Sequence, residues 1–521
     1  MQFATHKVRI MCVLVLLFSA GLRLHNLSSN PSGFFPDEAS TGYDAWSLIR
    51  NGGDQHGERW PFFFKSFADD IEGTYRYLTL LSILFLGPSV LAVRLPIALF
   101  GIFTVLILVH ISKHDTNRWA VILSALIAGF LPWHLPYCRT GQRIMLLPFA
   151  LALWYWIRCR AHDRNDRRLL LLSWFVLGLS VYTYVAARVV IPMLAAFVWI
   201  IDLIRYRTIR LSATHAFIFC LALLPFVYHA MSDPELFTLR FRQVSAMNSS
   251  ASIGQNARTI VNNYMLHFSP GFLFLAGDAN LRHHQAGFGQ LFKIQALLVP
   301  LGFIMMWKER NHHRIPLLIL LFIAPIPAAL SGEGNPHALR SVAMMIPLTL
   351  FSVDGFRLIA LMKWKRIITP LSVMVILTVM AESIEVAFDL TMRYPVYSAV
   401  AWEYGTREAV RSALPDAAQY DEIWITSRAI GADVLIAYDL GYPPEVFQKN
   451  RLLNSKLRWS WSAPIQSVYM EDSPKKRLFI VRPGEIPGSS VLPPILYPAD
   501  TAEAFRFIPG RRIDSATVSS R

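Results

Sequence analysis

The chain has 521 residues, of which 54% are hydrophobic and 16% are charged, and its mean hydropathy is +0.38. A soluble domain carries roughly 25% charged residues, so this composition excludes a soluble enzyme, a disordered chain and a secreted disulfide scaffold. The 50 Lys and Arg exceed the 35 Asp and Glu, which gives a net charge of +15. In so apolar a chain this excess indicates membrane topology, and we expect no nucleic-acid partner.

Apolar runs dominate the first three quarters of the chain. A helix needs roughly 20 apolar residues to cross a hydrocarbon core of about 30 Å, and only helices satisfy such a run's backbone in lipid. We count about eleven runs. They lie at 8–27, 93–112, 119–137, 143–158, 169–187, 188–204, 211–230, 291–307, 315–331, 340–361 and 367–386. The first run also fits a cleaved signal peptide, but it continues through Leu22 and Leu24, which favours an uncleaved helix.

The short loops predict the orientation of these helices. One alternate set of loops contains 18 Lys and Arg, and the short loops of the opposite set contain only Arg139, Arg143, Arg188 and Arg340. The positive-inside rule then places the N-terminus in the cytoplasm of a multi-pass protein of the cell inner membrane. The long loops at 28–92 and 231–290, together with everything after about residue 387, are predicted to lie outside.

The C-terminal part has a different composition. Strand-like runs occur at Glu422–Thr426 and Arg477–Val481, and helical periodicity occurs at Ala401–Leu414 and Ala429–Leu440. The sequence therefore predicts a polytopic all-α transmembrane domain at 1–390, which would contain the catalytic site. A small extracytoplasmic α/β domain is predicted at 391–521. The four cysteines lie in or beside apolar runs, and they form neither a disulfide framework nor a CxxC motif.

The first outer loop contains the strongest candidate for chemistry. Asp37 and Glu38 follow the first apolar run by about ten residues, between an aromatic pair and a helix start rich in small residues. A half-desolvated carboxylate near the interface can act as a base toward a hydroxyl, although a solvated loop is the alternative. Further along, the apolar stretch 78–87 is too short to span and predicts an interfacial helix. Arg94 is expected to extend to the lipid headgroups.

Five motifs in chain order resemble the GT-C membrane glycosyltransferases. The resemblance is to the bacterial branch similar to protein O-mannosyltransferases and lipid A aminoarabinose transferases. It covers residues 8–390 and extends more weakly into the outer tail. The motifs are Asp37-Glu38 followed by Gly52-Gly53-Asp54 and Val93-Arg94-Leu95-Pro96, Pro132-Trp133-His134 with Arg139-Thr140-Gly141, Tyr182-Thr183-Tyr184, Gly277-Asp278 through His284, and Pro336-His337-Ala338-Leu339-Arg340.

This resemblance implies an enzyme that moves one sugar from a polyprenyl-phosphate carrier to an acceptor on the outer face of the membrane. It assigns the general base to Asp37 and a supporting role to Glu38. A phosphate leaving group needs cationic partners rather than a general acid, and arginine binds phosphate in a bidentate manner. Arg282 and Arg340 are the leading phosphate candidates and Arg139 is a weaker one; for each, anchoring at the interface is the alternative.

The resemblance also raises the question of a divalent metal ion, because some relatives are thought to bind one between a first-loop carboxylate and a large-loop histidine. Glu72, His267 and His283 are weak candidates, and His283-His284 lacks the i, i+4 spacing that places two imidazoles on one helical face. Loop histidines with ordinary hydrogen bonds are the alternative. No cofactor is assigned.

Two other functions share these features. A transporter or flippase of lipid-linked glycans predicts paired halves with broken helices, and no second copy of the first half is visible in the sequence. A polymerase of such glycans would place its working loop late in the chain. The sugar is left open, as is the acceptor, which is a glycan, a lipid or a protein.

Overall fold

The computed structural model describes residues 2–66, 69–112, 118–234, 242, 244–362, 365–450, 456–459, 464–471, 473–498 and 502–510. The chain divides into two compact units. Unit 1 comprises residues 1–25, 63–75 and 97–390, and unit 2 comprises residues 26–62, 76–96 and 391–521. The end of unit 1 coincides with the boundary predicted near residue 390, but unit 2 combines the tail with two segments from the first hundred residues.

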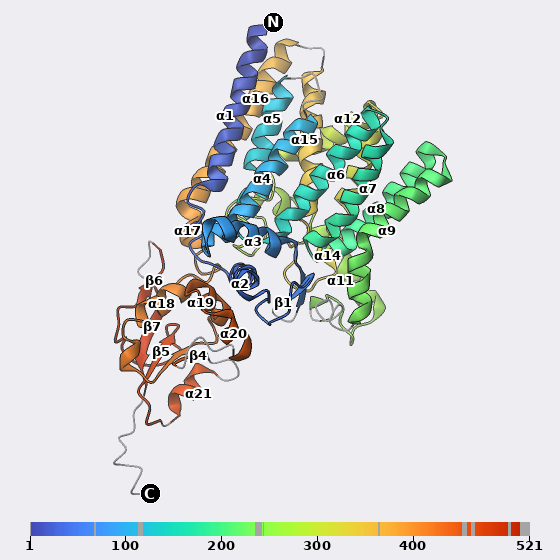
Figure 1. Ribbon diagram of the computed structural model, residues 1–521. Coiled ribbons are helices and arrows are strands. Elements are labelled where there is room, and N and C mark those ends of the chain that lie inside the picture. Colours follow the sequence, from blue (N-terminus) through green and yellow to red (C-terminus); the bar gives the residue numbers. More distant parts are fainter. Residues whose placement is uncertain are drawn as a thin grey trace. The chain divides into compact units, whose positions relative to one another are not determined.

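Unit 1 is a bundle of helices (Figure 1). In it, α1, α5 and α16 lie side by side, and α6 packs against α7, which packs against α9. The bounds of the helices are α1 Gln2–Leu24, α4 Val90–Ser112, α5 Arg118–Phe130, α6 Leu146–Asp163, α7 Arg167–Leu179, α8 Ala187–Tyr206, α9 Ile209–Ser232, α11 Ile253–Leu266, α12 Gln295–Lys308, α13 Ile315–Ile323, α14 Ile326–Ala329, α15 Met345–Ala360 and α16 Lys365–Phe388, with α4 belonging to unit 1 only from Ile97 onward.

Seven helical segments of the described residues are long and apolar enough to cross a membrane. They are Val90–Ser112, Arg143–Asp163, Ala187–Tyr206, Ile209–Ser232, His312–Ala329, Val342–Ala360 and Ile368–Tyr397. Each overlaps one of the predicted spans, which confirms a protein with several membrane helices. The predicted count of eleven stays a prediction. Of the other four predicted spans, the first corresponds to α1, and the remaining three correspond to α5, α7 and α12, which have only 13 or 14 residues.

Two glycines set the packing of α12 against α15. A Cβ atom added to Gly302 would lie 2.0 Å from the carbonyl oxygen of Phe351, and one added to Gly355 would lie 1.9 Å from that of Leu298. Small residues let helix backbones approach closely, which is how helices gain van der Waals contact where lipid removes the hydrophobic driving force. The two helices therefore form a tight pair.

A two-stranded antiparallel hairpin also belongs to unit 1. Strand β1 (Phe63–Ser66) pairs with β2 (Asp69–Glu72), with Phe63 opposite Glu72. The hairpin places the acidic residues of β2 directly before α3 (Thr74–Leu86), whose apolar side chains Leu84 and Phe85 are exposed. An exposed apolar helix of this length agrees with the predicted interfacial helix, although its depth in a membrane stays a prediction.

Unit 2 contains a five-stranded sheet with the order β4-β3-β5-β7-β6. Strand β3 is parallel to β4 and β5, whereas β7 is antiparallel to β5 and β6. The bounds of its elements are α2 Pro36–Asn51, α17 Tyr394–Tyr397, α18 Thr406–Ala413, β3 Glu422–Ile425, α19 Ala432–Asp439, α20 Pro444–Asn450, β4 Leu457–Trp459, α21 Ile465–Met470, β5 Arg477–Val481, β6 Ile495–Leu496 and β7 Glu503–Pro509. Strands β3 and β5 occupy the two predicted strand runs.

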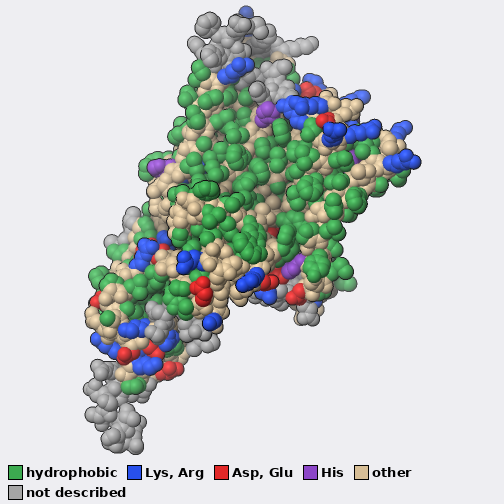
Figure 2. Space-filling model, viewed as in Figure 1, with side chains coloured by type: hydrophobic (Ala, Val, Ile, Leu, Met, Phe, Trp, Pro, Cys, Tyr) green, Lys and Arg blue, Asp and Glu red, His purple; other side chains and the backbone are tan. Residues whose placement is uncertain are grey.

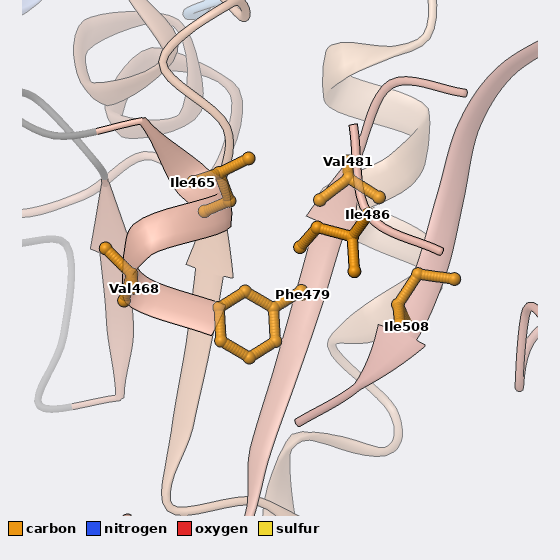
Figure 3. Close-up of a cluster of buried hydrophobic side chains, with 6 residues drawn as sticks. All are labelled: Ile465, Val468, Phe479, Val481, Ile486 and Ile508. Carbon is orange, nitrogen blue, oxygen red and sulfur yellow. The ribbon is translucent and has the colours of Figure 1, made fainter. Parts of the chain in front are cut away.

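The central strand β5 is buried along its whole length, which explains its continuous apolar sequence. One of its faces contributes to a hydrophobic core, which Figure 3 shows. Phe479 and Val481 of β5 pack there with Ile465 and Val468 of α21, together with Ile486 and Ile508. These contacts bury apolar surface between the sheet and α21, which stabilises this part of the tail.

Candidate functional site

Helix α2 presents the two predicted acidic residues to different surroundings. The helix begins at Pro36, whose fixed φ suits a first helical position, and Asp37 and Glu38 follow in its first turn. Neighbouring side chains on a helix point about 100° apart, so one face can be buried while the next residue is exposed. Glu38 is only 1% exposed, whereas Asp37 is exposed.

Glu38 forms a buried bidentate ion pair with Arg94. Arg94 Nε lies 2.8 Å from Glu38 Oε1, and Arg94 Nη2 lies 3.0 Å from Glu38 Oε2. Oε2 also accepts the backbone N–H of Phe35 at 2.9 Å. The prediction that Arg94 extends to the headgroups is wrong, because its guanidinium is fully buried. It donates further hydrogen bonds to three backbone carbonyl oxygens, those of Leu27, Pro31 and Gly33.

Asp37 lies next to this ion pair in the sequence, and its side chain is exposed. Its carboxylate has no hydrogen-bond or ion-pair partner within the part of the chain that the structure describes. Arg94 holds the loop that precedes Asp37 in place, so the backbone of Asp37 is fixed while its carboxylate oxygens remain available. This arrangement is what a proton acceptor for an external hydroxyl requires.

Two turns later on α2 lies a second buried ion pair, which the sequence did not predict. Arg76 Nε lies 2.5 Å from Asp44 Oδ2, and the backbone N–H of Gln55 donates to Asp44 Oδ1 at 3.0 Å. Burial raises the pKa of Asp44, and the charge of Arg76 opposes that shift. The signal in the sequence was the i, i+4 spacing of Ser40 and Asp44, which places both on the same face as the buried small residues of α2.

In unit 1, two acidic residues of β2, Asp70 and Glu72, are already paired. Glu72 Oε1 lies 2.7 Å from Arg188 Nη2, and Glu72 Oε2 lies 3.6 Å from Arg143 Nε. Asp70 Oδ2 lies 2.8 Å from His229 Nε2. Two guanidinium groups beside Glu72 disfavour a cation there, so this predicted metal ligand has a structural partner instead.

The late loops of unit 1 assemble an aspartate and two histidines. Asp278 Oδ2 accepts His283 Nδ1–H at 3.0 Å and the backbone N–H of Ala338 at 2.7 Å, and it lies 3.9 Å from His337 Nδ1. The two imidazole rings stack with their centroids 4.7 Å apart. Because these contacts join residues 278–283 to residues 337–338, they tie together two loops that are far apart in the sequence.

The surroundings shift the protonation of this cluster. Burial alone would raise the pKa of Asp278, but the hydrogen bond from His283 and those from backbone N–H groups outweigh burial and lower its pKa to about 2. Burial lowers the pKa of His337 to about 3, and positive charge from Arg340 acts in the same direction. At neutral pH the cluster is therefore a carboxylate that accepts hydrogen bonds from a neutral histidine.

The same cluster bears on the predicted metal ligands His283 and His267. Asp278, His283 and His337 each offer one ligand atom, and these atoms all lie within 4.8 Å of one another. Three such ligands match the number and type that a transition ion takes from a protein, but the charges of Arg282 and Arg340 oppose a cation. His267 cannot join them, because its Nδ1 donates to the carbonyl oxygen of Asn263 and its Nε2 accepts the N–H of His337.

The three arginines predicted to bind phosphate differ in their burial and in the partners of their guanidinium groups. Arg282 is half-buried beside the aspartate–histidine cluster. Arg340 pairs with Glu333, whose side chain is 49% exposed, at 2.6 Å, and it also donates to Ser331. Arg139 is buried and donates to the carbonyl oxygens of Leu22 and His25 at the end of α1. Arg139 thus acts as a cap for that helix end in this structure.

Comparisons with known proteins agree with this architecture. A family model described as dolichyl-phosphate-mannose-protein mannosyltransferase matches residues 74–231. Two solved structures of ArnT from Cupriavidus metallidurans are similar at 11% identity. The form bound to undecaprenyl phosphate gives a TM-score of 0.56 over 95% of this chain and 97% of that chain, and the apo form gives 0.55 over 92% and 94%. No curated protein matched the sequence.

The likeness to ArnT extends over nearly the whole of both chains, and at this identity it establishes the fold. The family match is independent of it and covers the segment from α3 to α9. The chain is a membrane protein with the GT-C fold, and it resembles the glycosyltransferases of the protein mannosyltransferase and ArnT type.

Proposed function

We propose that this chain transfers a single sugar from a polyprenyl-phosphate carrier to an acceptor hydroxyl, with Asp37 as the general base. The observation that carries the proposal is the contrast between two adjacent carboxylates. Glu38 is buried and neutralised by Arg94, whereas Asp37 is exposed, has no partner among the described residues and lies on a fixed helix start. The GT-C fold supports the choice of reaction, because a similar structure holds undecaprenyl phosphate.

The chemistry needs few groups. The bond between the sugar and the phosphate breaks while the acceptor oxygen attacks, so the phosphate leaves as an anion without protonation. A base that removes the proton of the attacking hydroxyl contributes typically 10²–10⁴-fold to such a step. We assign Glu38 a positioning role, since its carboxylate touches Arg94 and the backbone of Phe35 rather than any open space.

The leaving phosphate requires cationic partners, and we propose Arg282 and Arg340 for this role. Charge-assisted hydrogen bonds from arginine to phosphate oxygens stabilise negative charge where it develops. Arg340 is held by an exposed carboxylate that a phosphate can replace, whereas Arg139 is committed to two backbone carbonyl oxygens. We therefore rank Arg139 last among the three.

We further propose that the reaction takes place on the outer face of the cell inner membrane. The loop containing Asp37 belongs to the set whose short loops contain few basic residues, and the positive-inside rule places that set outside. Nucleotide sugars are confined to the cytoplasm, so a lipid-linked donor suits an external site. A tag inserted near Asp37 that reports the cytoplasm would contradict this assignment.

The test is a transfer assay in membranes with a panel of radiolabelled polyprenyl-phosphate sugars. Asp37→Asn should lower the rate of transfer by roughly 10²–10⁴-fold while leaving donor binding intact, because only the proton acceptor is lost. Glu58→Gln removes another exposed acid of the same loop and should have no effect. Full activity of Asp37→Asn would remove the base assignment, and transport of the carrier without a labelled acceptor would favour a flippase.

A further inference from the structure

A large cavity lies at the end of unit 1 that contains the basic loops. Its volume is about 1030 Å³, and it is lined by the C-terminal turns of α6 and α8, by the segment 309–313 and by the start of α13. Figure 2 shows Lys and Arg side chains gathered at this end of the helical bundle, above a broad hydrophobic surface. None of the residues proposed for sugar transfer lines it.

The charges in this cavity are not balanced. Of its three arginines, Arg158 is neutralised by Asp202, with Nη1 3.1 Å from Oδ2. Arg205 and Arg310 are exposed, and neither has a carboxylate within ion-pair range among the described residues. The one acidic lining residue, Glu309, faces Arg357 at 3.6 Å. The cavity thus contains two uncompensated positive charges.

Other residues that line the cavity also suit an anionic ligand with an apolar part. The histidines 162, 312 and 313 surround the same space and add hydrogen-bonding groups that suit a phosphate. The remaining wall is apolar: Ile201 and Ile204 of α8 face the cavity, together with Ile315 and Pro316 of α13. Ile204 is 69% exposed, so this wall continues onto the surface that a bilayer would cover. A ligand that fits must carry an anionic head and an apolar chain.

We propose that this cavity binds the headgroup of an anionic phospholipid, with the phosphate between Arg205 and Arg310 and an acyl chain along Ile201 and Ile204. Basic pockets between transmembrane helices on the cytoplasmic side are a recognised way to hold anionic lipids. The basic loops place this end of the bundle in the cytoplasmic leaflet by the positive-inside rule. The proposal is independent of the sugar-transfer assignment, since the two use different residues.

The experiment counts lipids retained by the purified full-length chain in native mass spectrometry, after titration with phosphatidylglycerol or with phosphatidylcholine. The wild type should retain phosphatidylglycerol more tightly. Each basic side chain near an anionic surface contributes roughly fivefold to binding, so Arg205→Gln combined with Arg310→Gln should weaken phosphatidylglycerol binding by roughly 30-fold. Binding of phosphatidylcholine should change little.

The matched control is Arg167→Gln combined with Arg168→Gln, which removes two exposed charges from the same end of the bundle outside the cavity. It should retain the lipid preference of the wild type, and equal loss in both pairs would overturn the proposal in favour of general electrostatic attraction. Displacement of the lipid by inorganic phosphate alone would also overturn it. If the glutamine pair fails to fold, the Arg205→Lys and Arg310→Lys pair must keep the binding, because it keeps the charge.

Discussion

The first long loop and the late loops both organise buried carboxylates, but with different partners. In unit 2, Glu38 and Asp44 are each neutralised by an arginine, Arg94 and Arg76. In unit 1, Asp278 is held by the imidazole of His283 and by backbone N–H groups, while the nearby Arg340 pairs with an exposed acid. An arginine remains charged at all accessible pH values, whereas a histidine does not. The first region thus keeps its cationic partners at every accessible pH, whereas the second depends on neutral histidines that acid can protonate.

The largest effect should come from breaking the ion pair between Arg94 and Glu38 in the first region. Arg94→Met leaves the Glu38 carboxylate buried without its partner, and removing one member of a buried pair costs about 3–5 kcal/mol. Thermal unfolding in detergent should show a strongly lowered Tm. The double variant Glu38→Leu with Arg94→Met should recover only part of this loss, because the carbonyl oxygens of Leu27, Pro31 and Gly33 stay without donors. Full recovery would mean that the ion pair alone fixes the loop.

A smaller effect is expected at the arginine of the late loops. Arg340→Ala should raise the apparent KM for the lipid-linked donor roughly tenfold to a hundredfold, because a hydrogen bond to a charged group is worth about 1.5–3 kcal/mol. The kcat should fall as well, because the charge on the leaving phosphate grows in the transition state. Steady-state kinetics measure both values. Glu333→Gln is the matched control, and it should lower KM because it releases Arg340 from its carboxylate. An unchanged KM in both variants would refute the phosphate role.

The smallest effect is a pH dependence confined to the late loops. The folded pKa of His337 is about 3, below the ordinary 6.5, so the unfolded chain takes up the proton first. The stabilisation is therefore complete above about pH 6.5 and is lost as the pH falls toward 3, while Asp278 stays ionised. Hydrogen exchange of peptides covering 277–284 and 336–341 should show falling protection below pH 6.5. Equal loss of protection in α2 would contradict the contrast between the regions.

How far the candidate site could be predicted differs for each residue. The position of Asp37 beside a helix start and the aromatic pair was readable, because these are local features. The burial of Glu38 was not, since it depends on Arg94, which is 56 residues away. His283 was a reasonable metal candidate, but its neighbours Asp278 and His337 come from separate loops. Nothing in the sequence around Glu72 and His267 indicated that other groups already contact their potential ligand atoms.

The sequence by itself determined the kind of molecule this is. Hydrophobic runs of span length, the distribution of basic loops and the ordered motifs predict a multi-pass membrane protein of the GT-C type, because lipid solvation acts on each segment separately. Only the tertiary structure decided which charged side chains pair with one another. Ion pairs such as Arg94 with Glu38 depend on backbone approach between distant segments, and that approach is set by packing rather than by local composition.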